Sequence, residues 1–193
     1  MHSRSNDPFA ERLDAATAEI LGRVRSLSTS NPAVLIDGRS GAGKTSLAAR
    51  VADAWPLAGR LQVVALDSLY PGWDGLAAGA ERARELILVP HGRGLLGTWR
   101  RWDWDEGAEA ESHAVDPALA LLVEGCGVLT PASARLADLT VWVDGPAESR
   151  RYRALERDGD AFRSHWKMWA AQEEAHIRRD DPRSLADLVV DVP

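Results

Sequence analysis

Residues 38–45, Gly-Arg-Ser-Gly-Ala-Gly-Lys-Thr, match the phosphate-binding template G-x-x-x-x-G-K-[ST] at every fixed position. The apolar run at 33–37 before them is typical of a buried strand, and residues 45–52 after them have helix formers and apolar side chains at helical spacing. A strand, a glycine-rich loop and a helix in this order let backbone N–H groups and the helix N-terminus surround a phosphate. A chance glycine turn is the alternative, and the flanking pattern argues against it.

The loop predicts a site for a nucleoside triphosphate with Mg²⁺. We expect Lys44 to reach the β- and γ-phosphates, and the hydroxyl of Thr45 to ligate the metal ion. The residues of this segment expected to contact the nucleotide are Gly38, Arg39, Ser40, Gly41, Ala42, Gly43, Lys44, Thr45 and Ser46.

Four further apolar runs predict strands of the same sheet, at 61–67, 118–123, 139–143 and 188–192. Helical segments separate these runs, which is the pattern of an α/β fold with a five-stranded parallel sheet covered on both faces. In such sheets ligands bind beyond the carboxyl ends of the strands. Asp67, Glu124 and Asp144 fall at those ends, so we expect them on the same rim as the glycine-rich loop.

Composition narrows the function classes. A chain of 193 residues suits one domain, 1–193, and its net charge of −6 argues against nucleic acid as the main partner. The single cysteine, Cys126, cannot form an internal disulfide, which fits a reducing cytoplasm. No apolar run approaches the roughly 20 residues of a membrane span, and residues 7–27 predict an amphipathic helix instead of a signal peptide. We therefore expect a cytoplasmic monomer or homodimer that binds neither nucleic acid nor membrane.

The segment 68–117 mixes aromatic and charged side chains between two core strands. Such an excursion from a rigid sheet is typical of a substrate-binding region. A decorated surface region whose tryptophans pack on the sheet is the alternative. If residues 98–105 are extended, Trp102 and Trp104 point to one side and Asp103 to the other. The candidate substrate-binding residues are Tyr70, Trp73, Asp74, Trp102 and Asp103.

Residues 146–158 predict a helix in which Arg150, Arg153 and Arg157 share one face, since they are three and four residues apart. A solvated basic face would have the same spacing. A second predicted helix, at about 160–178, carries aromatic side chains that we expect to be mostly core contacts.

Together these segments resemble the uridine kinase-like branch of the P-loop nucleoside and nucleotide kinases, over most of residues 33–193. The segments that carry the resemblance are the loop, Asp67-Ser68-Leu69-Tyr70, Trp102-Asp103-Trp104, Val123-Glu124-Gly125, and Asp144-Gly145-Pro146-Ala147-Glu148 with the arginines after it. The resemblance implies a three-layer P-loop fold with a lid helix, and ATP and Mg²⁺ as cofactors.

The resemblance also implies roles for matched residues. Asp67 corresponds to the catalytic base of that family, and Glu124 to an acid that helps to hold Mg²⁺ through water. Trp102 and Asp103 correspond to a piece that grips the nucleoside. The lid, residues 146–160, supplies arginines that close on the phosphates: Arg150, Arg153 and Arg157.

The activity implied is ATP-dependent transfer of the γ-phosphate to a hydroxyl of a nucleoside or similar small alcohol. The carboxylates of the expected site favour a neutral acceptor over an anionic one. A kinase acting on a nucleoside monophosphate or another small metabolite, and a non-catalytic ATP-binding regulator, are the alternatives. A GTPase switch would need an Asn-Lys-x-Asp type motif, which the sequence lacks.

Lys44→Ala should weaken ATP binding or abolish ATP-dependent turnover while the fold stays intact, because the ammonium group is the side-chain partner of the β- and γ-phosphates. Calorimetric titration with ATP and an assay of ADP release measure the two effects, and circular dichroism checks the fold. Normal turnover by a folded variant would contradict the assignment of the loop.

Overall fold

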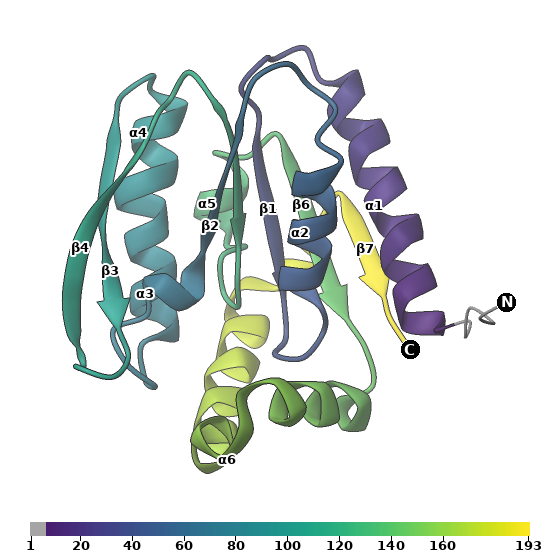
Figure 1. The fold of residues 1–193 in the computed structure, drawn as a ribbon, viewed down its shortest axis with the longest axis vertical. Coiled ribbons are helices and arrows are strands. Elements are labelled where there is room, and N and C mark those ends of the chain that lie inside the picture. Colours follow the sequence, from purple (N-terminus) through teal and green to yellow (C-terminus); the bar gives the residue numbers. More distant parts are fainter. Residues whose placement is uncertain (1–6) are drawn as a thin grey trace, which may run out of the picture.

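A computed structural model describes residues 7–193, apart from the side chains of residues 158, 160 and 161. Its centre is a five-stranded parallel sheet in the order β2-β5-β1-β6-β7 (Figure 1). The strands are β1 (Ala33–Gly38), β2 (Leu61–Ala65), β5 (Ala120–Glu124), β6 (Leu139–Asp144) and β7 (Leu188–Asp191). The predicted α/β class and its five parallel strands are confirmed, and the strand before the glycine-rich loop is the central one.

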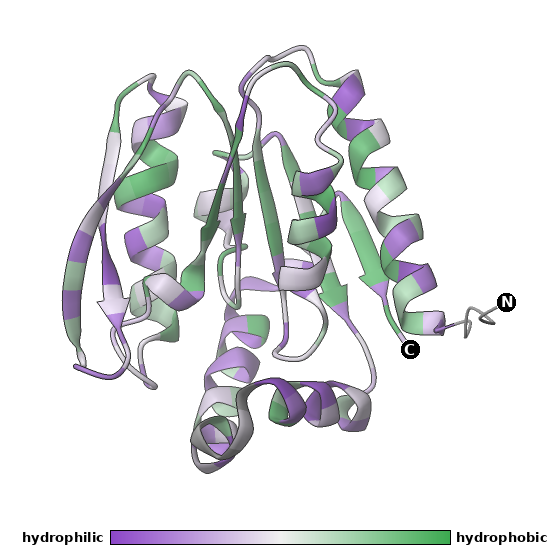
Figure 2. Cartoon of the chain, viewed as in Figure 1, coloured by the Kyte–Doolittle hydropathy of each residue, from purple (hydrophilic) through white to green (hydrophobic). Residues whose placement is uncertain are grey.

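The two faces of the sheet bury alternate side chains of the strands. Val34 and Ile36 of β1 pack against α1 (Pro8–Ser26) and α2 (Lys44–Asp53). Leu35 belongs to the core on the opposite face, because successive side chains of a strand point to opposite sides. That second core includes side chains of α3 (Leu76–Ala83) and α6 (Ala147–Asp180). Figure 2 shows the strands of the central sheet as strongly hydrophobic. With helices packed on both faces of this sheet, the fold has three layers.

Helix α1 forms where residues 7–27 predict it. The side chain of Asp7 accepts the backbone N–H of Phe9 at 3.0 Å, and Pro8 occupies the first turn, where a missing N–H costs nothing. The buried stripe of the helix consists of Leu13, Ala16, Thr17, Ile20, Leu21 and Val24.

The strand predicted at 61–67 is shorter than expected. β2 ends at Ala65, because the backbone N–H groups of Leu69 and Tyr70 donate to the carbonyl of Leu66 and turn the chain into a short helix. Asp67 therefore lies in a turn just beyond the strand rather than at its last position.

The chain between β2 and β5 forms six elements: η1 (Leu66–Ser68), α3, η2 (Arg84–Leu88), α4 (Val89–Gly92), β3 (Gly97–Asp103) and β4 (Ala108–Val115). The π-helical turn η2 joins α3 and α4, so helical structure continues from Leu76 to Gly92. β3 and β4 pair as an antiparallel hairpin beside the main sheet (Figure 1).

The extended segment expected at 98–105 ends at Asp103. The carboxylate of Asp103 accepts the backbone N–H of Asp105 at 3.1 Å, and this bond turns the chain at the hairpin tip. Trp104 therefore lies in the turn, so the expected alternation of Trp102 and Trp104 along one strand is wrong.

Helix α6 contains both predicted helices, 146–158 and 160–178. Gly159 separates them with φ 64° and ψ −144°, values outside the helical region. The helix ends at Asp181, and α7 (Pro182–Leu185) leads into β7.

The second part of α6 fastens the end of β1 through buried charges. Asp37, which is 1% exposed, accepts the backbone N–H groups of Gly127 and Leu129. His176 places Nε2 3.0 Å from Asp37 and Nδ1 2.8 Å from Asp180. Because each ring nitrogen faces a carboxylate oxygen, the protonated imidazolium fits this position. Burial lowers the pKa of His176, but the hydrogen bonds and charges of the two aspartates outweigh burial and raise it above the ordinary value.

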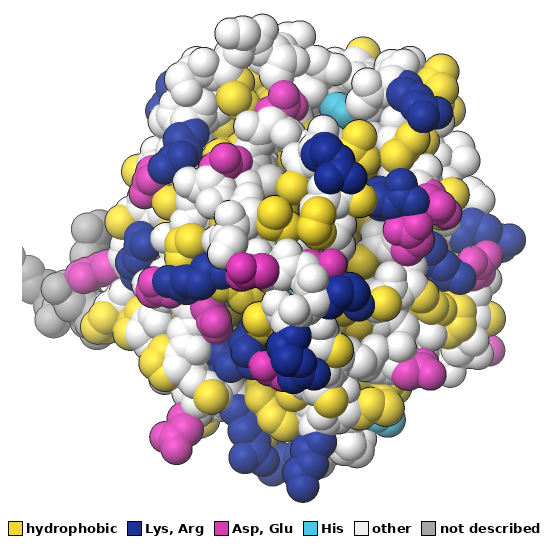
Figure 3. All heavy atoms as spheres, turned by 180° about the vertical axis from the view of Figure 1, so that it is seen from behind, with side chains coloured by type: hydrophobic (Ala, Val, Ile, Leu, Met, Phe, Trp, Pro, Cys, Tyr) yellow, Lys and Arg dark blue, Asp and Glu magenta, His cyan; other side chains and the backbone are white. Residues whose placement is uncertain are grey.

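Basic and acidic side chains are interspersed on the face seen in Figure 3. Ion pairs of the protein surface include Arg84 with Glu81 at 2.6 Å and Arg101 with Glu111 at 2.7 Å. Within residues 7–193 there is no helix of the length and apolarity needed to cross a membrane.

His176 predicts a pH-dependent stability. Because its pKa is raised in the folded protein, its contribution to the free energy of unfolding is complete below about pH 6.5, the unfolded value, and is lost as the pH rises through the folded-state pKa. Urea unfolding from about pH 6 to about pH 9 should show this decline. His176→Gln should flatten it and cost roughly 3 kcal/mol at about pH 6, since it leaves the buried Asp37 without its charged partner, whereas Asp180 keeps Arg179. His113→Gln, on the exposed hairpin, is the control and should keep the decline; an unchanged decline in His176→Gln would contradict the assignment.

Candidate active site

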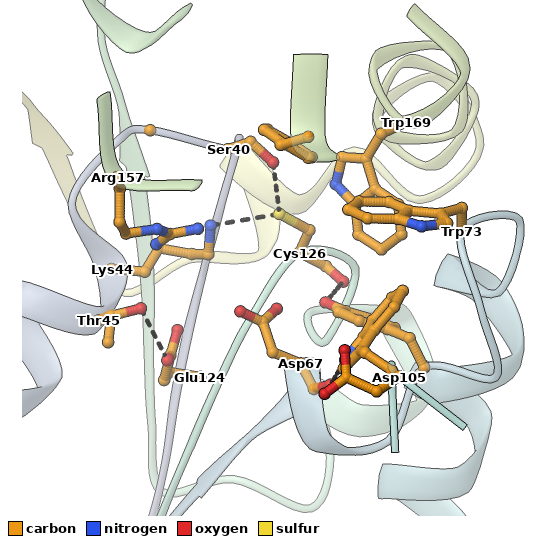
Figure 4. Close-up of a pocket in the computed structure, with 14 residues that line it drawn as sticks. Ser40, Lys44, Thr45, Asp67, Trp73, Asp105, Glu124, Cys126, Arg157 and Trp169 are labelled. Carbon is orange, nitrogen blue, oxygen red and sulfur yellow. Dashed lines mark hydrogen bonds between the residues drawn. The ribbon is translucent and has the colours of Figure 1, made fainter. Parts of the chain in front are cut away.

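A cavity of about 420 Å³ opens at the carboxyl ends of the strands (Figure 4). Its wall is formed by the glycine-rich loop, the turn after β2, the end of β5, the tip of the β3–β4 hairpin and α6. In Figure 4, Lys44, Thr45, Glu124 and Arg157 lie on one side, Trp73, Trp169 and Asp105 on the other, and Asp67 and Cys126 between them. We call these the phosphate side and the acceptor side.

The glycine-rich loop is tightly enclosed. Gly41 and Gly43 have φ values of 75° and 100°. A Cβ at Gly41 would lie 1.9 Å from the carbonyl oxygen of Arg150, and one at Gly43 would lie 2.7 Å from the ring of Phe9. Only glycine can adopt a positive φ without strain and leave room for such close neighbours. Because these neighbours belong to α6 and α1, the two helices fix the path of the loop.

Lys44 is 8% exposed, and its Nζ donates to the carbonyl of Arg39 and to Sγ of Cys126, both at 3.2 Å. Burial lowers the pKa of Lys44, but attraction to Cys126, Glu124 and Glu173 outweighs burial and raises it. Burial also raises the pKa of the Cys126 thiol to about 12. The thiol is therefore neutral at neutral pH. The carboxylates of Glu124 and Glu173 keep Lys44 charged.

Glu173 supports the loop from behind. Its Oε1 accepts the backbone N–H of Ser40 at 2.7 Å, the hydroxyl of Ser40 at 2.6 Å and the thiol of Cys126 at 3.3 Å. Glu173 is buried, with 3% exposure. The sequence placed Ser40 in the loop but gave no reason to connect it with a glutamate 133 positions later.

Thr45 and Glu124 offer oxygen ligands at the head of α2. The hydroxyl of Thr45 donates to Oε1 of Glu124 at 3.0 Å. Burial raises the pKa of Glu124, Lys44 opposes this rise and Asp67 adds to it. The described residues contain no group of three or more His, Cys, Asp or Glu side chains arranged to hold a metal ion. One or two protein oxygens together with substrate phosphates suit Mg²⁺, so this pair fits the ion that the sequence implies.

The carboxylate of Asp67 points into the cavity (Figure 4). The turn that carries it is fixed from the hairpin, because Nε1 of Trp104 donates to the carbonyl of Asp67 at 2.8 Å. The expected rim position of Asp67 beside Lys44 and Glu124 is therefore present, and its role as a base stays a prediction.

Five aromatic rings line the acceptor side: Tyr70, Trp73, Trp104, Phe162 and Trp169. Tyr70 and Trp73 were predicted there. Phe162 and Trp169 were expected to be core contacts, and both are buried core residues that also line the cavity. The sequence signal for them was their helical spacing on α6, which does not show that the helix faces a ligand site.

The other predicted substrate residues lie elsewhere. Trp102, Asp103 and Asp74 do not line the cavity. Asp103 instead pairs with Arg101 at 3.0 Å and caps the hairpin turn, and backbone N–H groups together with Arg101 lower its pKa. The structure thus places the neighbouring Trp104 and Asp105 where Trp102 and Asp103 were expected.

Two of the predicted lid arginines hold the glycine-rich loop in this structure. Arg150 is buried, pairs with Asp144 at 3.2 Å and donates to the carbonyl of Ser40 at 3.2 Å. Arg153 donates to the carbonyl of Gly41 at 2.8 Å. Both thus connect the first part of α6 to the backbone of the loop.

Arg157 and Arg39 lie in different surroundings. Arg157 lines the cavity on the phosphate side, together with Lys44. Arg39, a predicted nucleotide contact, pairs with Glu174 at 2.8 Å and with Asp144 at 3.8 Å, so its guanidinium group is held by carboxylates of the protein.

A second hollow of about 200 Å³ lies beside the first. It shares Gly41, Lys44, Thr45 and Arg157 with the larger cavity. Its other lining residues are Phe9, Gly43, Ser46, Arg153 and Ala154. The glycine-rich loop therefore borders two adjoining hollows, and Ser46 contributes to the smaller one.

No protein-family model and no curated protein matches the chain. Among solved structures, a possible uridine kinase from Bacillus stearothermophilus is 17% identical with a TM-score of 0.68, and the match covers 94% of this chain and 98% of that one. A "putative fructose transport system kinase" from Silicibacter sp. TM1040 is also 17% identical, with a TM-score of 0.52 and coverage of 92% and 98%. Likeness at this identity concerns the fold, and the chain has the fold of these P-loop kinases over nearly its whole length.

Proposed function

We propose that the protein is an ATP- and Mg²⁺-dependent kinase that transfers the γ-phosphate to a hydroxyl of a small acceptor that is not anionic. The observation that carries this proposal is the pair of hollows that meet at Lys44, Thr45 and Arg157. A donor nucleotide in the smaller hollow and an acceptor in the larger one would bring their reacting groups together at these side chains. The kinase names of the two similar folds support the same class of reaction.

On the phosphate side, charge neutralisation is the main task of the protein. Lys44, which stays protonated, would hold the β- and γ-phosphates, and Arg157 would neutralise the transferred group. Thr45 and Glu124 would hold Mg²⁺. When bound there, the ion would supply positive charge that offsets the charge of the phosphates.

On the acceptor side, Asp67 would accept the proton of the acceptor hydroxyl. The hydroxyl oxygen forms a bond to the γ-phosphorus as the bond to the β-phosphate oxygen breaks, and ADP leaves. The products are ADP and a phosphomonoester. A nucleoside, which the sequence resemblance implies, is one acceptor of this class, whereas a nucleoside monophosphate would bring negative charge beside Asp67 and Asp105.

Asp67→Asn should lower the rate of phosphate transfer by about 10²–10⁴-fold, because it keeps the shape of the side chain and removes the proton acceptor. The affinity for ATP should change little. Coupled detection of ADP release at saturating ATP measures the rate. Asp74→Asn, which removes a carboxylate outside the cavity, is the matched control and should retain full activity. Transfer at the normal rate in Asp67→Asn would show that another group accepts the proton; an unmodified protein that binds ATP and phosphorylates no acceptor would be a regulator.

Substitutions at Arg157 and at Arg150 should have different effects. Arg157→Gln should lower turnover by about 10²–10³-fold, since it removes a charge from the phosphate side. Arg150→Gln should lower the free energy of unfolding by roughly 3 kcal/mol, because Asp144 loses the nearer of its two basic partners and the loop loses a donor. Urea unfolding and steady-state kinetics on both variants separate the effects. Normal turnover in Arg157→Gln would argue against a phosphate-binding role for Arg157.

A further inference from the structure

The acceptor side of the cavity combines aromatic rings with carboxylates. Asp105 lies on the side of the five rings and Asp67 lies between the two sides, whereas the cationic lining residues, Lys44 and Arg157, lie on the phosphate side (Figure 4). We propose that the acceptor alcohol carries a positively charged amine or ammonium group, held by these rings and by Asp105. This inference rests on the proposed kinase function and names the chemical class of its acceptor.

The first argument is charge. The hairpin tip is fixed against the turn after β2, because Trp104 donates to the carbonyl of Asp67 at 2.8 Å. This contact keeps Asp105, the next residue, at the cavity wall. Two carboxylates therefore face a cavity with a partly aromatic wall, and both are exposed, so their attraction for an opposite charge is moderated by solvent. An ammonium group on the acceptor would pair with Asp105 while its hydroxyl lies near Asp67.

The second argument is the kind of hydrogen-bonding group available. Carboxylates only accept hydrogen bonds when ionised. Two donors of this wall already have partners, since Trp104 bonds to Asp67 and the hydroxyl of Tyr70 donates to the carbonyl of Cys126 at 2.8 Å. The carbonyl groups of a nucleobase need donors, and among the rings of this wall only the indole N–H groups of Trp73 and Trp169 are left to supply them. An ammonium group brings its own donors or needs none.

The third argument is the angle between the rings. Trp169 meets Trp73 at 89° and Tyr70 at 74°, and Trp104 meets Trp73 at 55°. Rings that meet at such steep angles form a corner, and a corner fits a compact group better than a flat one. This arrangement resembles the aromatic cages that hold ammonium groups, in which a cation lies within about 6 Å of ring centroids.

A flat base would instead need two parallel faces about 7 Å apart, one contact distance on each side. The near-parallel contacts of Trp73 are narrower than this. His165 stacks on it with centroids 4.3 Å apart, and Phe162 lies at 5.7 Å with 30° between the planes. Insertion of a base at either contact would require these rings to separate.

The test compares alcohols that differ only in charge. Choline and its uncharged tert-butyl isostere form one pair, and linear amino alcohols with their des-amino counterparts form others; uridine represents nucleosides. Binding is followed by tryptophan fluorescence with Mg²⁺ and a non-hydrolysable ATP analogue, and transfer by ADP release with ATP. At least one charged member should bind about tenfold or more tightly than its uncharged partner. If no charged member does so, the inference is overturned.

Variants of the hairpin tip locate the effect. Asp105→Asn should reduce the preference for the charged member by roughly tenfold, since one charged partner is lost. Glu106→Gln removes the same charge from the next residue of the turn, which does not line the cavity, and should keep the preference. An equal preference in Asp105→Asn and in the unmodified protein would overturn the assignment of the ammonium group to Asp105.

The two proposals fail in different ways. Phosphorylation of uridine or of uncharged alcohols, with no preference for charge, would support the kinase function and overturn the charged acceptor. Charge-dependent binding without transfer of phosphate to any compound would support the ammonium site and overturn the kinase function.

Discussion

Two buried carboxylates from behind the glycine-rich loop set the shape on which the site depends. A loop that surrounds phosphate with backbone N–H groups has few side chains of its own to hold it. Glu173 binds the backbone and hydroxyl of Ser40, and Asp37 binds the loop after β5. Buried carboxylates are stable only with partners, and His176 supplies one for Asp37. The geometry of the phosphate side thus depends on the second part of α6, more than 130 positions from the loop.

The acceptor side depends on contacts of another kind. It is assembled from the turn after β2, the hairpin tip and α6, and none of these belongs to the central sheet. Ring contacts and the bond from Trp104 to Asp67 join these pieces. Under the proposed function, the sheet would keep the reacting end of the site constant while segment 68–117 would select the acceptor, in agreement with the way that folds host different functions.

The sequence was informative where local pattern decides structure. The glycine-rich loop, α1 and the central strands follow from residue type and spacing, because a buried strand or an amphipathic helix is encoded within a dozen residues. The hairpin was harder: β4 was not expected, and the extended segment stopped early because the side chain of Asp103 bonds to the backbone of the next residues. Trp104 and Asp105 therefore replaced Trp102 and Asp103 at the cavity. Long-range pairs such as Glu173 with Ser40 leave no local trace, since only tertiary packing brings them together.

Gly159 divides α6 into two parts that point in different directions (Figure 1). Before it, the helix carries Arg157 at the cavity; after it, Glu173 and His176 hold the loop and the sheet. The backbone of Gly159 has a conformation that residues with a side chain rarely adopt. In a straight helix, the direction of the part with Arg157 would be fixed by the position of the part with Glu173 and His176. Because the helix bends at Gly159, the direction of the part before it can differ from one kinase of this fold to another without a change in the contacts that hold the glycine-rich loop.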